Sequence, residues 1–187
     1  MLLQLLAANY PAEAVREFPE KQFHRYLTQY GISASDGAFL RRVAPDPSHP
    51  YIHVDMTQCI TCFRCVRICN ELQGQFVWKV WDRSDATRIV PDSGTTLRES
   101  SCVACGACVD SCPSGALEDK SILELGVAEK WTRTTCSYCG VGCEMMVGTH
   151  GNRIVQIRPA LDAPVSKGHL CVKGRYAFDF VHAPDRI

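Results

Sequence analysis

Cysteine spacing constrains this chain more than any other feature of its sequence. Twelve of the 187 residues are cysteine, and they fall into three sets of four. The first two sets share one spacing, in which two residues separate each of the first three cysteines and three residues precede the fourth. These sets are Cys59, Cys62, Cys65 and Cys69, and Cys102, Cys105, Cys108 and Cys112. Thiols placed this regularly predict two bound metal clusters with the fold built around them.

Two other uses of cysteine fit this spacing poorly. Disulfides suit short secreted chains, but no signal peptide is visible here, and thiols so close in sequence make poor disulfide geometry. Zinc usually takes four ligands from two Cys-x-x-Cys pairs, which would leave the third cysteine of each run without a role. We therefore expect iron-sulfur clusters.

The two runs resemble those of bacterial two-cluster ferredoxins. Pro113 follows Cys112 as in that family, whereas Asn70 follows Cys69, so only the second run carries the full pattern. The resemblance implies that the fourth cysteine of each run ligates the cluster of the other run. We also expect Gly106 to let the backbone approach the second cluster closely. The implied ligands are Cys59, Cys62, Cys65 and Cys112 for cluster 1, and Cys102, Cys105, Cys108 and Cys69 for cluster 2.

The third set of cysteines has a different spacing. It comprises Cys136, Cys139 and Cys143, followed by the distant Cys171. Four thiolates again suit one 4Fe-4S cluster, cluster 3, although a structural zinc would accept the same two separated groups. The cysteines already supply three complete sets, so we assign no histidine ligand. We expect His169 at most to contact a ligand cysteine without binding the cluster itself.

The sequence around the third set resembles the start of the catalytic chain of molybdopterin-dependent oxidoreductases. The resemblance rests on Thr134–Cys143 (TTCSYCGVGC), Gly168–Arg175 (GHLCVKGR) and Phe178–Arg186. Within that superfamily the chain is most similar to the alpha subunit of cytoplasmic, NAD-linked formate dehydrogenases, over nearly its whole length from about Pro50 onward.

This resemblance implies an electron-transfer module with three 4Fe-4S clusters. Cluster 3 would be the one nearest the pterin, and Lys173 would lie between that cluster and the pterin. The molybdenum or tungsten bis-pterin guanine dinucleotide is expected in an adjoining domain or subunit, and a flavin subunit with further iron-sulfur centres would reduce NAD. We assign no catalytic residue within the chain, so by itself it should move electrons and not oxidise formate.

A second interpretation also accommodates both kinds of cysteine motif. The large subunits of complex I-like NADH dehydrogenases and of related hydrogenases share them, so the chain could be an electron-input arm of such an assembly. The string Cys136–Cys143 favours the formate dehydrogenase. The first residue falls within a helical connector of the longer family members, which indicates a short variant, a separate subunit or part of a longer polypeptide.

The charge balance excludes several other classes of function. Twenty basic and twenty acidic residues cancel, which gives no electrostatic basis for binding nucleic acid or an anionic membrane. No apolar run approaches the ~20 residues that a membrane helix needs. The cysteines are assigned to metal binding and not to disulfides, and no export signal is visible. We therefore expect a reducing, cytoplasmic location.

The chain is expected to be α+β and to have three parts. Residues 1–48 form a helical segment in which Phe23–Tyr30 is a helix stopped by Gly31, and prolines at 45–50 form a linker. Residues 51–119 form the two-cluster ferredoxin-like domain, with a strand at 52–55, a short helix ending at each fourth cysteine, and an inserted hairpin of 76–81 with 88–90. Residues 120–187 form a helix at 121–130, strands at 144–149 and 153–158, and a helix from about Lys173, together making the small molybdopterin-oxidoreductase-type 4Fe-4S domain. Three aromatic residues of the hairpin could cover a cluster, face a partner or fill a core: Phe76, Trp78 and Trp81.

Overall fold

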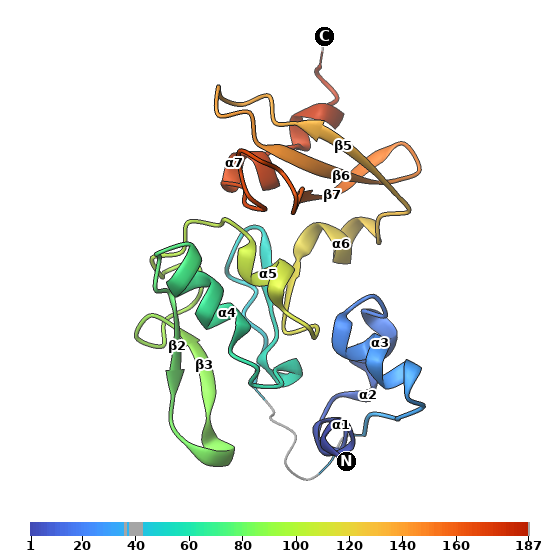
Figure 1. Ribbon diagram of the computed structural model, residues 1–187, viewed down its shortest axis with the longest axis vertical. Coiled ribbons are helices and arrows are strands. Elements are labelled where there is room, and N and C mark those ends of the chain that lie inside the picture. Colours follow the sequence, from blue (N-terminus) through green and yellow to red (C-terminus); the bar gives the residue numbers. More distant parts are fainter. Residues whose placement is uncertain (36, 38–42, 187) are drawn as a thin grey trace.

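The computed structural model describes residues 1–35, 37 and 43–186. Within these residues it contains short helices and three small antiparallel sheets, which confirms the α+β class (Figure 1). Three parts follow one another along the chain: N-terminal helices, a central part with two short sheets, and a C-terminal part built on a three-stranded sheet. The N-terminal part contacts the central part beside Cys112, and the C-terminal part contacts it through Arg175 and Tyr176.

The N-terminal part is helical, as the sequence predicts. It comprises α1 (Leu2–Ala7), α2 (Ala12–Glu17) and α3 (Gln22–Gln29). Phe23 and Leu27 are buried in a small core, and Gly31 follows α3 with a left-handed φ of 62°, as expected of a residue that stops a helix. The remaining predicted positions, 36 and 38–42, lie outside the described residues.

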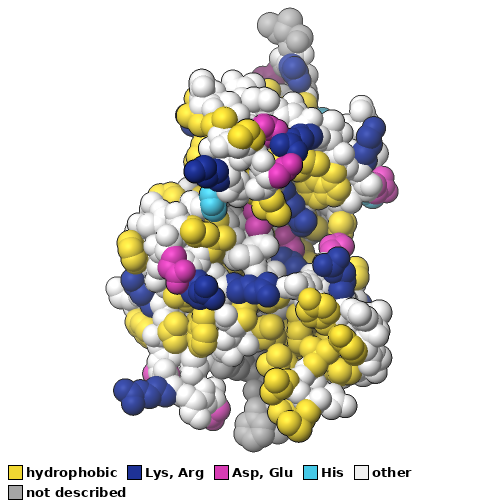
Figure 2. Space-filling model, in the orientation of Figure 1, with side chains coloured by type: hydrophobic (Ala, Val, Ile, Leu, Met, Phe, Trp, Pro, Cys, Tyr) yellow, Lys and Arg dark blue, Asp and Glu magenta, His cyan; other side chains and the backbone are white. Residues whose placement is uncertain are grey.

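The N-terminal helices dock on the segment that follows Cys112. Phe23 N–H donates to the carbonyl of Pro113 at 2.8 Å, and Lys21 forms a buried ion pair with Glu118 at 2.8 Å. The opposite face of α1 stays exposed, and Figure 2 shows apolar side chains gathered over this end of the molecule.

The central part begins and ends in one two-stranded sheet. Strand β1 (Ile52–Val54) pairs antiparallel with β4 (Leu117–Asp119), so that Ile52 lies opposite Asp119. Between them lie η1 (Met56–Gln58), α4 (Arg64–Arg67), the π-helix η2 (Ile68–Leu72), the hairpin β2 (Trp78–Trp81) and β3 (Arg88–Pro91) with η3 (Ser84–Ala86) at its turn, and α5 (Ala107–Ser111). This pairing brings the two cysteine runs side by side.

Two local predictions for this part need correction. Cys112 directly follows α5 as predicted, but Cys69 lies inside a helical stretch that continues as η2 to Leu72. The hairpin strand starts at Trp78, because Phe76 has a left-handed φ of 56° that breaks the extended backbone.

The C-terminal part is an antiparallel meander of β5 (Lys130–Thr135), β6 (Glu144–His150) and β7 (Arg153–Pro159). Before it, α6 (Lys120–Leu125) is shorter than the predicted helix because Gly126, with φ 88°, ends it. The predicted turn between β6 and β7 is present, and the predicted C-terminal helix is α7 (Val172–Tyr176), followed by η4 (Asp179–His182).

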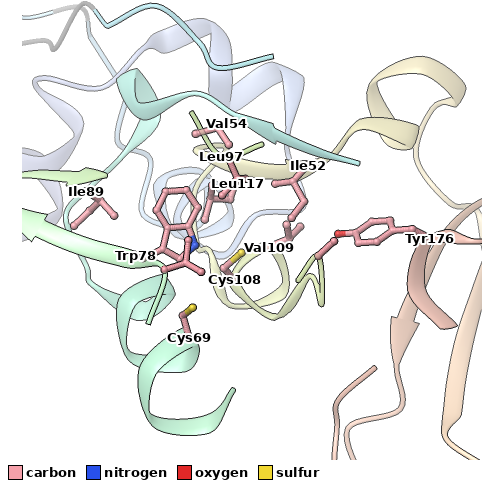
Figure 3. Close-up of a cluster of buried hydrophobic side chains, with 12 residues drawn as sticks. Ile52, Val54, Cys69, Trp78, Ile89, Leu97, Cys108, Val109, Leu117 and Tyr176 are labelled. Carbon is pink, nitrogen blue, oxygen red and sulfur yellow. The ribbon is translucent and has the colours of Figure 1, made fainter. Parts of the chain in front are cut away.

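The main core surrounds the cysteines of the central part. Cys69 and Cys108 belong to it together with Trp78, and Tyr176 of α7 packs against it from the C-terminal part (Figure 3). Its other fully buried members are Ile52, Val77, Leu97 and Leu117. The C-terminal part has only a three-residue core of its own, so its packing on the central part matters for its stability. No helix among the described residues has the length and apolarity needed to cross a membrane.

Candidate iron-sulfur sites

The first group of cysteines lines one small cavity of the central part. Its lining includes all four cysteines implied for cluster 1: Cys59, Cys62, Cys65 and Cys112. The last comes from the end of α5 and the others from the loop before and the start of α4. Apolar side chains, among them Met56, Ile89 and Leu117, complete the wall.

The second group lines a separate small cavity. The thiols are Cys102, Cys105, Cys108 and Cys69, the set implied for cluster 2. Each cavity therefore takes its fourth thiol from the other run, which is the crossed grouping that the ferredoxin resemblance implies. The pairing of β1 with β4 explains it, because this pairing holds the end of α5 beside the first loop.

The two ligand loops have the same backbone conformation. Thr61 and Phe63 in the first loop, and Ala104 and Gly106 in the second, all have positive φ, from 51° to 73°. In both loops the N–H of the residue two after the first cysteine points at that cysteine's Sγ at 3.4 Å, from Thr61 to Cys59 and from Ala104 to Cys102. Left-handed residues at alternate positions curl each loop and turn its N–H groups toward sulfur.

The electrostatics of these thiols fit a bound cluster. Burial raises the pKa of the Cys65 thiol and that of the Cys108 thiol far above the ordinary value for cysteine. The charges of neighbouring cysteines raise both pKa values further. Thiolates so buried and so close repel one another unless a cation compensates them. A donor set of four sulfurs in a dry cavity with inward N–H groups fits a 4Fe-4S cluster, for which thiolate is the usual ligand.

The third set gathers where the meander meets α7. Cys136 follows β5 and its N–H donates to the carbonyl of Cys143 at 2.8 Å, while Cys171 caps α7. Burial raises the pKa of Cys143, and the charges of Cys136, Cys139 and Cys171 raise it further. Cys136 also lies against α7, because a Cβ built on Gly174 would be 3.3 Å from its Sγ. Cys139 and Cys171 are exposed, so this set lies at the surface.

Two predicted residues beside this set differ in their surroundings. Lys173 is exposed on the first turn of α7, two residues beyond Cys171. His169 shares a 2.7 Å hydrogen bond between its Nδ1 and Nε2 of Gln73, which lies just after η2. This bond ties the third set to the helical stretch that carries Cys69.

Cys65 of the first cavity and Cys108 of the second influence each other electrostatically. The two thiols are near enough for the charge of Cys65 to raise the pKa of Cys108. Trp78 is 1% exposed and its indole hydrogen-bonds the Cys108 thiol, with the ring nitrogen turned to that sulfur (Figure 3). Of the three hairpin aromatics, Trp78 thus covers a candidate ligand, whereas Phe76 is exposed.

Sequence reasoning missed the polar junction between the second and third sets. Arg175 of α7 is buried and ion-paired to Asp110 of α5 and Asp119 of β4. Asp119 also accepts hydrogen bonds from Tyr176 at 2.8 Å and Gln156 at 2.6 Å. No local pattern could indicate this network, because its partners are far apart in sequence; the GHLCVKGR string, which contains Arg175, was the only available signal.

Two family models match the parts that carry the cysteines. Residues 49–118 match the ferredoxin-like domain of NADH-quinone oxidoreductase subunit 3, and residues 129–183 match the molybdopterin oxidoreductase Fe4S4 domain. The chain therefore carries two iron-sulfur domains, one of the kind found in NADH-quinone oxidoreductases and one of the kind found in molybdopterin oxidoreductases.

Three curated relatives support this assignment. "Putative formate dehydrogenase YrhE" of Bacillus subtilis is 36% identical over 77% of this chain and 19% of its own length. "Probable oxidoreductase YjgC" of the same organism is 32% identical over 76% and 18%, and an NADH-quinone oxidoreductase subunit of Rhizobium meliloti is 31% identical over 100% and 22%. The chain spans about a fifth of the length of these relatives.

A solved structure is similar as well. It is a crystal structure of an NAD⁺-reducing [NiFe]-hydrogenase in the H₂-reduced state, with a TM-score of 0.55 and 25% identity. The similarity covers 64% of this chain and 52% of the hydrogenase chain.

Proposed function

We propose that the chain holds three 4Fe-4S clusters and relays electrons within a formate dehydrogenase. The partners would be a pterin site containing molybdenum or tungsten, where formate is oxidised, and a flavin subunit that reduces NAD, in the cytoplasm. The observation that carries the electron relay is that four cysteines line each of two cavities, with the third set of four following where the meander meets α7. The formate assignment draws on the string Cys136–Cys143 and on the similarity to YrhE.

The protein supports electron transfer at these sets in three ways. A bound 4Fe-4S cluster accepts and releases single electrons with little structural change. The residues of the chain hold the thiols at fixed places, exclude water from the first two cavities with apolar walls, and turn N–H groups toward sulfur. These contacts set how readily each site is reduced.

The second set is the middle of the series. It is coupled electrostatically to the first set through Cys65 and Cys108, and it meets the third set through α7, whose Val172 and Tyr176 pack on the core that contains Cys69 and Cys108. The first set lies on the side of the N-terminal helices, since Phe23 contacts Pro113 beside Cys112. We propose that the third set, with its exposed Cys139, Cys171 and Lys173, faces the pterin.

A second assembly is favoured by specific observations. The ferredoxin-like match is to an NADH-quinone oxidoreductase subunit, and the relative that aligns with all of this chain also belongs to an NADH-quinone oxidoreductase. The similar solved structure is an NAD⁺-reducing hydrogenase. The same three sets would then serve as an electron-input arm of a hydrogenase or a complex I-like assembly.

The electron donor distinguishes the two assemblies. The native assembly that contains this chain would be purified without oxygen and given formate, hydrogen or NADH in turn, and the bleaching of cluster absorption near 400 nm would be recorded. Bleaching by formate is the expected result. Bleaching by hydrogen or NADH with no response to formate would replace the formate dehydrogenase by the second assembly.

A further inference from the structure

Arg175 is the buried cation at the junction of the second and third sets. Its side chain is 1% exposed, and it extends from α7 into the central part. Its Nη1 and Nη2 bind the carboxylate of Asp110, and Nη2 also lies 3.0 Å from Oδ2 of Asp119. The guanidinium and the Asp119 carboxylate are thereby taken out of water, whereas Asp110 stays partly exposed. A buried ion pair is costly unless every member is satisfied.

One donor of this arginine is left over. Among the described residues no acceptor lies within hydrogen-bond distance of Arg175 Nε, which is itself buried. A buried N–H without a partner costs about 1–3 kcal/mol, and such atoms are rare in native structures. The ion pairs account for the terminal nitrogens of Arg175 and leave Nε unexplained.

The unpartnered Nε lies against the second ligand loop. A Cβ built on Gly106 would overlap Nε and Cδ of Arg175, so the guanidinium stem touches the backbone between Cys105 and Cys108. The charge of Arg175 also lowers the pKa of the Cys105 thiol, against the larger opposing effect of burial. Gly106 and Cys105 both line the second cavity.

We propose that Arg175 is the residue that tunes the second site, by placing its buried positive charge and its unpartnered Nε–H against the loop between the ligands Cys105 and Cys108. The proposal rests on the proposed function, because it requires a cluster on the second set. A nearby cation favours the reduced, more negative state of a cluster, so Arg175 raises the reduction potential of this site. Because Arg175 lies on α7, which Cys171 caps, it connects the second site with the third set.

The buried cation nearest the first site in the hydrogen-bond network of the described residues is Lys21, which donates to the carbonyl of Leu117 in the cavity wall, but its charge is paired with Glu118. The cation that acts on its Cys62 is Arg64, whose charge lowers the pKa of that thiol against the larger opposing effects of burial and Cys112, and Arg64 is exposed to solvent. Water and salt screen an exposed charge much more than a buried one. Arg64 is therefore a matched control for Arg175.

The test is a redox titration of the reconstituted 187-residue chain, followed by electron paramagnetic resonance. The signal of the second site would be identified with Cys105→Ser. Arg175→Gln is expected to make the midpoint potential of this site more negative, with the first and third sites unchanged and iron content retained. Arg64→Gln should shift the first site by less. Asp110→Asn should shift the second site in the positive direction, because it removes a negative charge from the same network.

Arg175→Lys keeps the charge without the Nε–H fork and should give a midpoint between those of Arg175→Gln and the wild type. An unchanged midpoint in Arg175→Gln with full iron would overturn the proposal and leave Arg175 a packing residue. If Arg175→Gln fails to bind its iron, Asp110→Asn decides, and a midpoint that does not rise would overturn it. Absence of a second-site signal in the wild type would instead contradict the proposed function.

Discussion

Phe63 and Gly106 occupy the same position in the two ligand loops and share one left-handed backbone conformation, with φ of 59° and 73°. The first loop imposes this conformation on a bulky residue, whereas the second has a glycine whose missing side chain makes room for Arg175. The repeat of the sequence is thus also a repeat of the backbone, and the two loops differ where the C-terminal part packs on the second.

Gly106→Ala is expected to destabilise the holoprotein strongly. Besides the ~1 kcal/mol of strain that a left-handed alanine costs, its Cβ would overlap Arg175 and displace the buried ion-pair network. Gly31→Ala is the matched control, since Gly31 has φ 62° and nothing within 4 Å of a built Cβ. Thermal unfolding of the two variants should show the larger loss for Gly106→Ala, and equal losses would contradict the close approach of Arg175.

The crossed grouping predicts opposite losses in two serine variants. Cys112→Ser should damage the first site and leave the second largely intact, whereas Cys69→Ser should damage the second and leave the first. Iron analysis with Mössbauer and paramagnetic resonance spectra of each variant would show which site is lost. Loss of the second site in Cys112→Ser would mean that each run holds its own cluster.

His49 should make stability depend on pH below neutrality. Its ring is buried, its Nδ1 accepts N–H groups of Tyr51 and Ile52, and burial, with Lys120 and Arg98, lowers its pKa from 6.5 to about 4 against the opposing charge of Asp46. Between these two values the unfolded chain binds a proton that the folded chain does not. Stability is therefore fully present above pH 6.5 and falls by about 1.4 kcal/mol per pH unit toward pH 4.

His49→Asn separates this effect from that of His24, whose pKa burial also lowers. Asparagine keeps an acceptor and does not titrate, so the variant should lose less stability than the wild type between pH 7 and pH 5, as measured by unfolding at each pH. His150→Asn, at the exposed end of β6, is the control for loss of a histidine. Parallel pH profiles for His49→Asn and the wild type would show that His49 does not titrate with folding.

The spacing of the cysteines can be interpreted from the sequence, whereas their surroundings cannot, for physical reasons. Spacings such as Cys59–Cys65 reflect the size of the cluster, so they can be read from a local stretch. The strand β5 was missed because the expected helix 121–130 extended through Gly126, where the backbone turns to φ 88°. Arg175 could not be assigned because its partners Asp110 and Asp119 lie 65 and 56 residues away, and only the packing of α7 brings them together.

Lys173→Ala should slow the reduction of the sites by formate without loss of iron, in a protein that joins this chain to its pterin-metal domain. We expect a decrease of roughly tenfold, equivalent to about 1.4 kcal/mol, if its ammonium lies between the third set and the pterin. Rapid-mixing absorption would measure it, with Lys130→Ala, on exposed β5, as the control. Equal rates for the two variants would make Lys173 an ordinary surface lysine.

The iron and acid-labile sulfide content of the chain tests the central claim most directly. Three sets of four thiols should bind about twelve iron and twelve sulfide per chain after reconstitution without oxygen, with broad brown absorption near 400 nm. Cys105→Ser and Cys136→Ser should each affect a different third of the metal. Zinc without acid-labile sulfide, or only about eight iron per chain, would contradict three 4Fe-4S clusters.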